Sequence, residues 1–232
     1  MNSPHRFFLL PAIGLAVVLT AHPAQAQSRV GEAAMVKNEV LRVAAATTPI
    51  NVGDALLRDE TVRTGLESAA RLVMADSTNL SLGPNASLKL DRTVFDDEHH
   101  YRDVAVRLTS GAFRFVTGHS EKAAYKITTP LATIGVRGTV LDILSQRGRS
   151  VVVLQDGAAS VCTTSQQCVQ LTQPGDTAII TSTGGKVSIS KTNTPPWTFA
   201  ATCSQAAGLC TVTQFADATP VGDDPAGMLC GR

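Results

Sequence analysis

The fold of this chain is decided by a stretch near its middle, Ile127-Thr128-Thr129-Pro130-Leu131-Ala132-Thr133-Ile134-Gly135-Val136-Arg137-Gly138-Thr139. The runs at its two ends, residues 125–128 and 139–144, read as short strands with one buried face. Pro130 suits the start of a strand, where a missing N–H is tolerated. Gly138 suits a turn or a close approach of two backbones that a Cβ would block. The stretch therefore predicts short strands joined by tight turns.

The same pattern extends in both directions, from about residue 36 to residue 189. Turn-forming Gly, Asp, Asn or Pro interrupts the chain every eight to twelve residues, as at Gly53-Asp54, Pro84 and Asp156-Gly157. The strongest predicted strands are residues 71–74, 80–82, 87–90, 104–108, 113–116, 125–128, 139–144, 150–154 and 177–181. No window in this region keeps apolar residues at i, i+3, i+4 and i+7 over three turns, so helices are excluded there. We therefore predict an all-β fold: a sandwich, a barrel or a solenoid-like stack of hairpins.

Six blocks of this region follow one another in order: residues 52–65, 70–86, 110–116, 127–139, 152–157 and 171–176. Together they resemble the FecR domain family, and residues 127–139 are the most specific of the six. The residues that match the family's pattern, to which we assign structural roles, are Gly53, Asp54, Thr64, Gly65, Pro84, Asn85, Gly111, Pro130, Arg137, Gly138, Thr139 and Gly157.

The resemblance implies an all-β body of short paired strands, stacked in a twisted solenoid-like or barrel-like form, and an exported, non-enzymatic role. The family's namesakes are transmembrane regulators that relay iron-siderophore status from an outer-membrane receptor to a cytoplasmic sigma factor. Only a few residues precede the first apolar run of this chain, and none of them forms a segment that could hold a sigma factor. We therefore expect a stand-alone member of the family.

Residues 1–26 have the three parts of a secretory signal peptide. Arg6 supplies a positive start, residues 7–20 form an apolar run of 14, and Ala24-Gln25-Ala26 gives a cleavage site before Gln27. The alternative is an uncleaved membrane anchor. However, such a run makes about 21 Å of helix against a hydrocarbon core of roughly 30 Å, and Pro11 interrupts it. The sequence therefore predicts export to the periplasm or beyond the cell.

Export favours disulfides as the state of the five cysteines. Cys162 and Cys168 flank a polar segment between two strand-like runs, and Cys203 and Cys210 flank residues 204–209 in the same manner. We expect two local disulfides, with Cys230 free or paired to another chain. A zinc site is disfavoured because the required C-x₂₋₄-C or histidine spacing is missing.

Two further groups of residues have a structural and a functional interpretation. Arg137 lies among apolar residues and is either an internal arginine bonded to strand-edge carbonyls or an exposed ligand contact. Residues 96–100, Asp-Asp-Glu-His-His, are read as a solvated loop rather than a metal site. Neighbouring side chains of an extended strand point in opposite directions and cannot converge on one ion.

The sequence argues against several classes of function. Cleavage after Ala26 would remove Arg6 and no acidic residue, leaving 19 basic and 19 acidic side chains of the 20 and 19 in the chain. Such a balance lacks the basic field of a nucleic-acid-binding protein. No G-x-S-x-G, H-E-x-x-H or phosphate-binding loop is present, so we expect no catalytic residue, cofactor or metal.

These observations divide the chain into a signal peptide (1–26), a FecR-like β-domain (36–189) and a Pro/Thr linker with a cysteine-containing C-terminal tail (190–232). We expect a periplasmic binding or sensing module that engages another envelope protein through strand edges or turns, with no stable membrane span after cleavage. The alternative is a secreted or surface-attached structural or adhesive element, joined through its cysteines.

Overall fold

The computed structural model describes residues 28–95, 101–120 and 125–205, which form one mixed β-sheet and one short helix. The first eight strands are β1 (Arg29–Lys37), β2 (Val40–Val43), β3 (Thr47–Pro49), β4 (Ala55–Leu57), β5 (Thr61–Thr64), β6 (Ala69–Met74), β7 (Asn79–Leu82) and β8 (Ser87–Phe95). The others are β9 (Tyr101–Val116), β10 (Tyr125–Thr128), β11 (Ala132–Gln146), β12 (Arg149–Thr163), β13 (Cys168–Leu171), β14 (Thr177–Thr183) and β15 (Lys186–Thr192), and the helix is α1 (Phe199–Gln205). The predicted all-β fold is confirmed.

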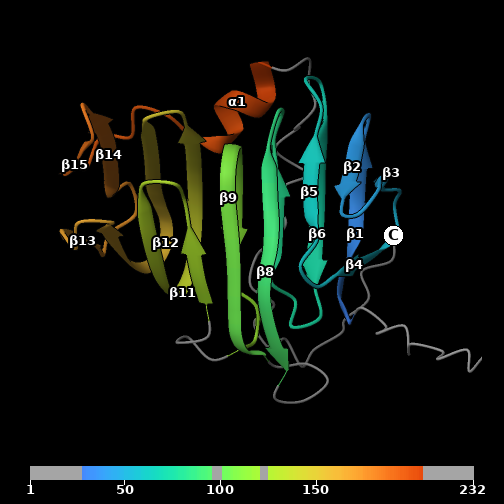
Figure 1. Cartoon of the computed structure of the whole chain (residues 1–232). Coiled ribbons are helices and arrows are strands. Elements are labelled where there is room, and N and C mark those ends of the chain that lie inside the picture. The colour runs from blue at the N-terminus through green and yellow to red at the C-terminus, as the bar shows by residue number, and fades with distance from the viewer. Residues whose placement is uncertain (1–27, 96–100, 121–124, 206–232) are drawn as a thin grey trace, which may run out of the picture.

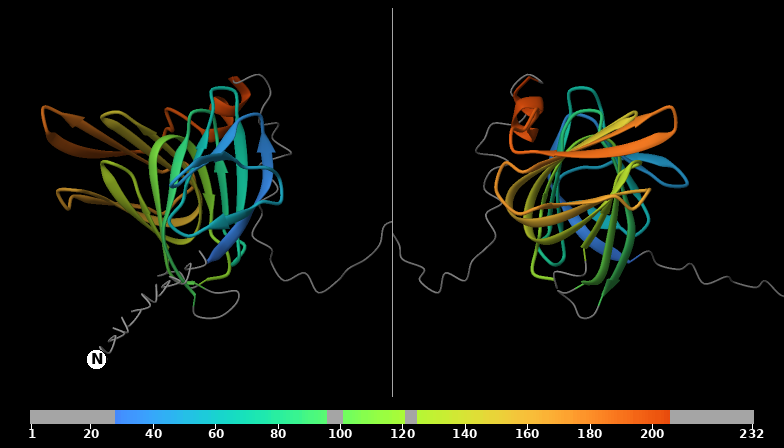
Figure 2. Two further views of the ribbon diagram at one scale, coloured as in Figure 1. Left: turned by 45° about the vertical axis from the view of Figure 1, so that its right-hand side comes forward. Right: turned by 90° about the vertical axis from the view of Figure 1, so that its left-hand side faces the viewer.

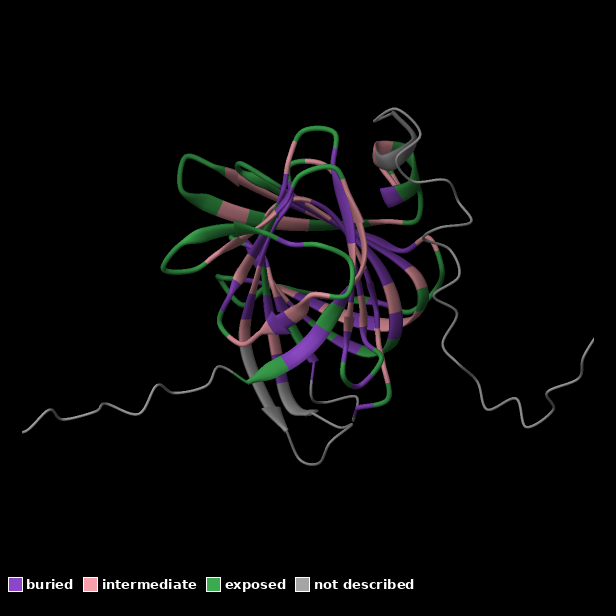
Figure 3. Cartoon of the chain, turned by 90° about the vertical axis from the view of Figure 1, so that its right-hand side faces the viewer, coloured by how far each residue is buried: buried purple, intermediate pink, exposed green. Residues whose placement is uncertain are grey.

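The strands succeed one another along the body in the order β15-β14-β12-β11-β10-β9-β7-β6-β1-β4, with β8, β5, β2 and β3 joined through β9 (Figure 1). Strands β14 and β15 lie at one end and β1 to β4 at the other. Turned by 90°, the strands curve around a common interior and carry many buried residues (Figure 3). The architecture is one mixed sheet, which fits the all-β body with an irregular C-terminal tail that the resemblance implies.

A single apolar cluster fills the interior, and alternation along each strand selects its members. In β9, Phe113 and Phe115 point inward and are almost fully buried, whereas Arg114 between them lies on the outer face. In β11, Leu141 and Ile143 belong to the same cluster. Burying aliphatic and aromatic side chains of this kind stabilises a fold by about 1.5–3 kcal/mol each.

Three long strands, β9, β11 and β12, change their neighbours partway along. The first half of β9 pairs with β8 and β10, and its second half pairs with β7 and β11. The change occurs at Gly111, whose φ is +102° and where a Cβ would lie 2.4 Å from Cα of Ala86. Only glycine tolerates both the backbone conformation and the contact. Because these long strands bend, each of them pairs with different neighbours along its length, and two turned views show the resulting curvature of the sheet (Figure 2).

Several expectations fall outside the described residues. These are the signal peptide, the loop at residues 96–100, the Cys203–Cys210 disulfide and Cys230. Within the described part, residues 199–205 add a helix to the tail that the sequence did not predict.

Candidate functional site

The end of the most specific sequence block, Val136-Arg137-Gly138-Thr139, forms an irregularity in β11. Residues before it pair with β10 and residues after it pair with β9, while β12 runs alongside throughout. Oγ1 of Thr139 accepts a hydrogen bond from the N–H of Arg137 (2.9 Å) and donates one to the carbonyl of Ala158 on β12 (2.8 Å). The N–H of Thr139 donates to Oγ1 of Thr117 (2.7 Å). Thr139 thereby supplies hydrogen-bond partners for backbone groups that the bend leaves unpaired in the sheet.

Gly157 completes this bend from the facing strand. It has a φ of +83°, and a Cβ built on it would lie 1.8 Å from the carbonyl oxygen of Gly138. The two backbones therefore approach more closely than any side chain allows. The structure places Gly138, Thr139 and Gly157 together at one bend.

Other residues of the family pattern meet at a second corner, next to Gly111. Oγ1 of Thr64 donates to the carbonyl of Gly83 (2.7 Å) and accepts from the N–H of Ala86 (2.8 Å). The N–H of Asn85 donates to the carbonyl of Gly65 (2.9 Å), and Pro84 lies in the same turn.

Three more positions of the pattern, Gly53, Asp54 and Pro130, lie in turns or connections between strands. Asp54 accepts a hydrogen bond from the N–H of Asn51 (2.8 Å) beside Gly53, and Pro130 is exposed between β10 and β11. In this structure most of the family pattern serves turns and bends.

Arg137 differs from its neighbours in this pattern, because its side chain is exposed. Among the described residues its guanidinium has no hydrogen-bond or ion-pair partner. It lines an open groove of about 480 Å³ on the outer face of β11, β12 and β13. The side chain of Arg137 is therefore exposed and not internal, and its role as a ligand contact stays a prediction.

The floor of the groove is made of small residues and its rim is polar. Gly135 and Ser160 are cross-strand partners, and Ser160 is in turn paired with Gln170 on β13. Nε2 of Gln170 donates to Oγ of Ser160 (2.9 Å). Nothing lies within 4 Å of a Cβ built on Gly135, so the floor is open there. Among the described residues that line it, Arg137 alone is charged, so the groove suits a carboxylate, which a guanidinium binds in a bidentate manner.

Strand β15 is a second candidate surface, because it is paired on one side only. It forms a hairpin with β14 across Gly184 and Gly185, both with positive φ (58° and 80°). Within the described part of the chain, no strand pairs with its other edge. In a two-residue hairpin the flanking residues exchange both backbone hydrogen bonds, and such pairs then alternate along the ladder. The N–H groups of Val187, Ile189 and Lys191 therefore point away from β14.

Lys191 connects the edge of β15 with the groove. Its Nζ donates to the carbonyl of Gln170 (2.9 Å) and forms an ion pair with Asp176 (2.7 Å). The hydrogen bond from Lys191, together with that from the N–H of Thr172, holds the pKa of Asp176 below its ordinary value. Edge and groove thus form one continuous surface around Gln170.

One buried polar cluster holds a turn in place. The hydroxyl of Tyr125 donates to Asp76, which also accepts from Oγ1 and the N–H of Thr78 (2.9 Å each). Burial and the neighbouring Asp76 raise the pKa of Tyr125 to about 12. This cluster ties the turn after β6 to the start of β10.

The predicted disulfide between Cys162 and Cys168 is present and closes the β12–β13 hairpin beside the groove. Among the described residues, no three His, Cys, Asp or Glu side chains are placed to hold a metal ion. Within the same ranges, no helix has the length and apolar character needed to cross a membrane.

The edge of β15 was missed by sequence reasoning, although a signal for it exists. Gly184-Gly185 is a hairpin dipeptide, and the alternation of Val187, Ser188 and Ile189 after it is that of a half-buried strand. The groove has no such signal, because it depends on which strands lie side by side.

Comparison with known proteins bears directly on the family. A family model described as "FecR protein" matches residues 60–160, which confirms the resemblance. No curated protein matches the sequence.

Two crystal structures of a proposed anti-sigma factor from Parabacteroides distasonis, at 1.65 and 2.50 Å resolution, resemble this fold. Their TM-scores are 0.45 and 0.46, with 15% sequence identity over 56% of this chain. The chain spans 58% of the length of those chains.

Proposed function

We propose that this chain, whose residues 60–160 belong to the FecR family, is an exported, non-enzymatic signalling module that binds another envelope protein. The observation that carries the proposal is the edge of β15, with its row of outward N–H and C=O groups. An edge of this kind can accept an additional strand from a partner, which is a recurrent mode of peptide recognition.

The composition of β15 supports recognition rather than accidental pairing. Its exposed side chains include Lys186, Ser188, Ser190 and Lys191, while Val187 and Ile189 are partly buried against the core. Exposed lysines discourage edge-to-edge association between copies of a protein. A partner strand with acidic residues would be attracted to the same lysines.

The groove next to this edge adds a second contact. Arg137 is available for a carboxylate, and Gln170 and Thr172 offer polar groups on the opposite rim. A partner whose strand adds to β15 could place an acidic side chain near this groove. Backbone pairing would then supply the binding free energy, and the charges would supply orientation.

The proposal is tested by photo-crosslinking in intact cells of the source organism. A photoreactive amino acid replaces Ser188 on β15, and the matched control replaces Arg63, which is exposed on β5 at the other end of the body. We expect one envelope protein to be crosslinked through position 188 and not through position 63. Equal crosslinking from both positions would contradict an interface at β15.

Export has its own test, cell fractionation with intact-mass analysis of the native protein. We propose a soluble periplasmic species that begins at Gln27 and retains the Cys162–Cys168 disulfide. A full-length species held in the membrane would contradict signal-peptide cleavage. Multimers linked through cysteine would instead support the structural or adhesive alternative.

A further inference from the structure

The segment after β15 is attached to the outside of the sheet rather than built into it (Figure 1). Phe199, the first residue of α1, is 1% exposed and packs with Ala69 and Ala112 in a cluster separate from the main core. Partly buried Met35 and Leu144 border this cluster. Phe199 therefore packs on the outer face of the sheet, whose inner face is already covered by the main core.

Small residues make room for the ring of Phe199. Cε2 of the ring lies 3.6 Å from the place where a Cβ on Gly83 would be. Ala112, the adjacent position on β9, is 1% exposed and contributes only a methyl group. The pocket is thus a recess between β6, β7 and β9 whose shape comes from the sheet.

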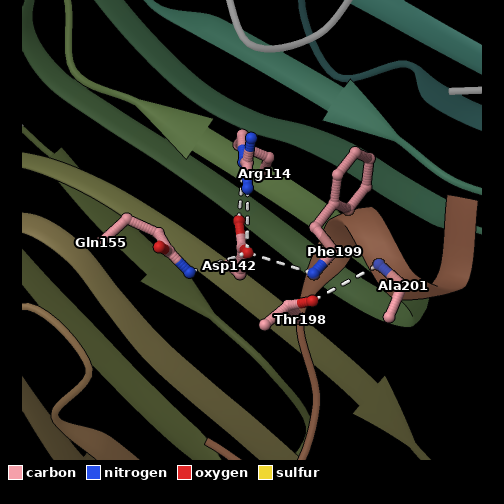
Figure 4. Close-up of polar contacts among 6 residues, drawn as sticks. All are labelled: Arg114, Asp142, Gln155, Thr198, Phe199 and Ala201. Atoms are coloured by element: carbon pink, nitrogen blue, oxygen red, sulfur yellow. Dashed lines mark hydrogen bonds and ion pairs between the residues drawn. The ribbon is translucent and has the colours of Figure 1, made fainter. Parts of the chain in front are cut away.

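A buried carboxylate at the edge of this recess receives the backbone of the segment (Figure 4). Oδ2 of Asp142 accepts a hydrogen bond from the N–H of Phe199 (3.1 Å). The same carboxylate is held by Nε and Nη2 of Arg114 (2.7 and 3.0 Å) and by Nε2 of Gln155 (3.0 Å). The guanidinium of Arg114 also lies 5.6 Å from the centre of the Phe199 ring, within cation–π range.

All the groups that hold the segment belong to the β-domain and keep partners without it. Asp142 would retain Arg114 and Gln155, which sit on β9 and β12. The recess would then expose Ala69, Ala112 and an oriented carboxylate. An apolar recess with one fixed polar group has the character of a peptide-binding site, with Phe199 as the aromatic anchor.

We propose that this recess, here called the Asp142 recess, is a peptide-docking site that the chain fills with its own residues 197–205, and that the same segment of a second copy can fill it instead. The proposal does not depend on the role given to β15. Exchange between copies replaces each contact with an identical one, so it costs little free energy at equilibrium.

The connection to β15 suits such an exchange. Only residues 193–196, Asn-Thr-Pro-Pro, separate β15 from Trp197. Consecutive prolines favour an extended, semi-rigid chain of about 3.1 Å per residue. The segment can therefore swing as a unit about the end of β15.

The affinity of the segment of one copy for the recess of another can be estimated from how fully the segment is docked in its own chain. A short tether holds a segment at an effective concentration on the order of 1 mM. If the segment is docked about nine times in ten, its dissociation constant in trans is about 100 µM or lower. Unsubstituted chains should thus be mainly monomeric at low micromolar concentration.

The test is a complementation experiment with two full-length variants, both carrying Cys230→Ser so that disulfide linkage is not read as docking. The donor carries Ala112→Glu, which fills its own recess but leaves its segment intact. The acceptor carries Phe199→Asp, which removes the ring that fills the recess and replaces it with a charged group that an apolar recess disfavours. The acceptor also carries Trp197→Phe, so the single tryptophan of the mixture belongs to the donor segment.

On mixing at about 200 µM each, we expect a dimer by light scattering and a blue shift of the donor Trp197 emission. Each variant alone should stay monomeric. Val52→Asp in the acceptor, an exposed position far from the recess, should leave association unchanged. If the mixture stays monomeric with unchanged emission while circular dichroism shows both variants folded, the proposal is wrong.

A second donor variant is available if the first does not fold. Ala69→Glu blocks the same recess from β6 and replaces Ala112→Glu if that variant is unfolded. In addition, a labelled peptide of residues 194–205 with Ser at position 203 should bind the acceptor at least tenfold more tightly than the unsubstituted chain. Equal binding to both would show that the peptide does not compete with the docked segment.

Discussion

Replacing Asp142 with Asn removes a negative charge from the most heavily hydrogen-bonded carboxylate in the described part of the chain. Asp142 is 0% exposed and accepts from Arg114 twice, from Gln155 and from the N–H of Phe199. An amide offers one acceptor oxygen and turns an NH₂ group toward these donors. Arg114, with a side chain 18% exposed, is left as a poorly solvated charge without its partner.

The magnitude follows from the burial of this pair. Breaking a buried ion pair from one side costs about 3–5 kcal/mol. With a urea m-value of about 2 kcal/mol/M for a domain of this size, the midpoint of unfolding should fall by about 1.5–2.5 M. Urea titration monitored by far-ultraviolet circular dichroism measures the shift.

The matched control is Asp91→Asn, which breaks the exposed pairs that Asp91 forms with Arg107 and Lys89. The N–O distance of the Arg107–Asp91 pair is 2.8 Å against 2.7 Å for Arg114–Asp142, but Arg107 is 58% and Asp91 28% exposed. Exposed pairs contribute about 0–1 kcal/mol. Equal shifts for the two variants would refute the argument that burial makes the Asp142 cluster important.

Three further outcomes are expected. Gly157→Ala should lower the free energy of unfolding by at least about 2 kcal/mol or prevent folding, because its Cβ would overlap the carbonyl of Gly138; a variant with an unchanged melting temperature would contradict the bend. Tyr125 should ionise in the folded protein at about pH 12, whereas in the unfolded chain it ionises at its ordinary pKa of 10. Deprotonation therefore favours the unfolded state above about pH 10, and the free energy of unfolding should fall between about pH 10 and 12. Absorbance at 295 nm measures the ionisation in a Tyr101→Phe background, and a midpoint near 10 would argue against the buried hydrogen bond to Asp76. Arg137→Glu should change stability by less than about 0.5 kcal/mol while weakening crosslinking through β15, and a large loss of stability would mean that the arginine is structural.

Much of the fold could be predicted because alternation and turn chemistry are local. Residues 87–90 and 150–154 lie in strands as expected, since each carries its own pattern of burial. The sequence divided β9 into two strands, residues 104–108 and 113–116, whereas the structure has one strand bent at Gly111. A glycine between two strands signals an interruption, and whether the chain turns or bends depends on partners far away.

The candidate surfaces were harder to predict for the same reason. Asp142 lies in an apolar run, and its partners Arg114 and Phe199 are 28 and 57 residues away. The groove beside Arg137 depends on β11, β12 and β13 lying side by side. Local patterns indicate which face of a strand is buried, but they do not indicate which outer faces meet a distant segment.

Strand addition at the edge of β15 is tested by comparing Val187→Pro with Val187→Thr in the crosslinking experiment. Proline removes an N–H that points away from β14, so it spares the β14–β15 hairpin and removes one bond to an added strand. Threonine changes the side chain and keeps the N–H. We expect proline to abolish crosslinking through position 188 while the protein stays folded, whereas threonine should retain it. Crosslinking that survives proline would contradict strand addition at the edge of β15.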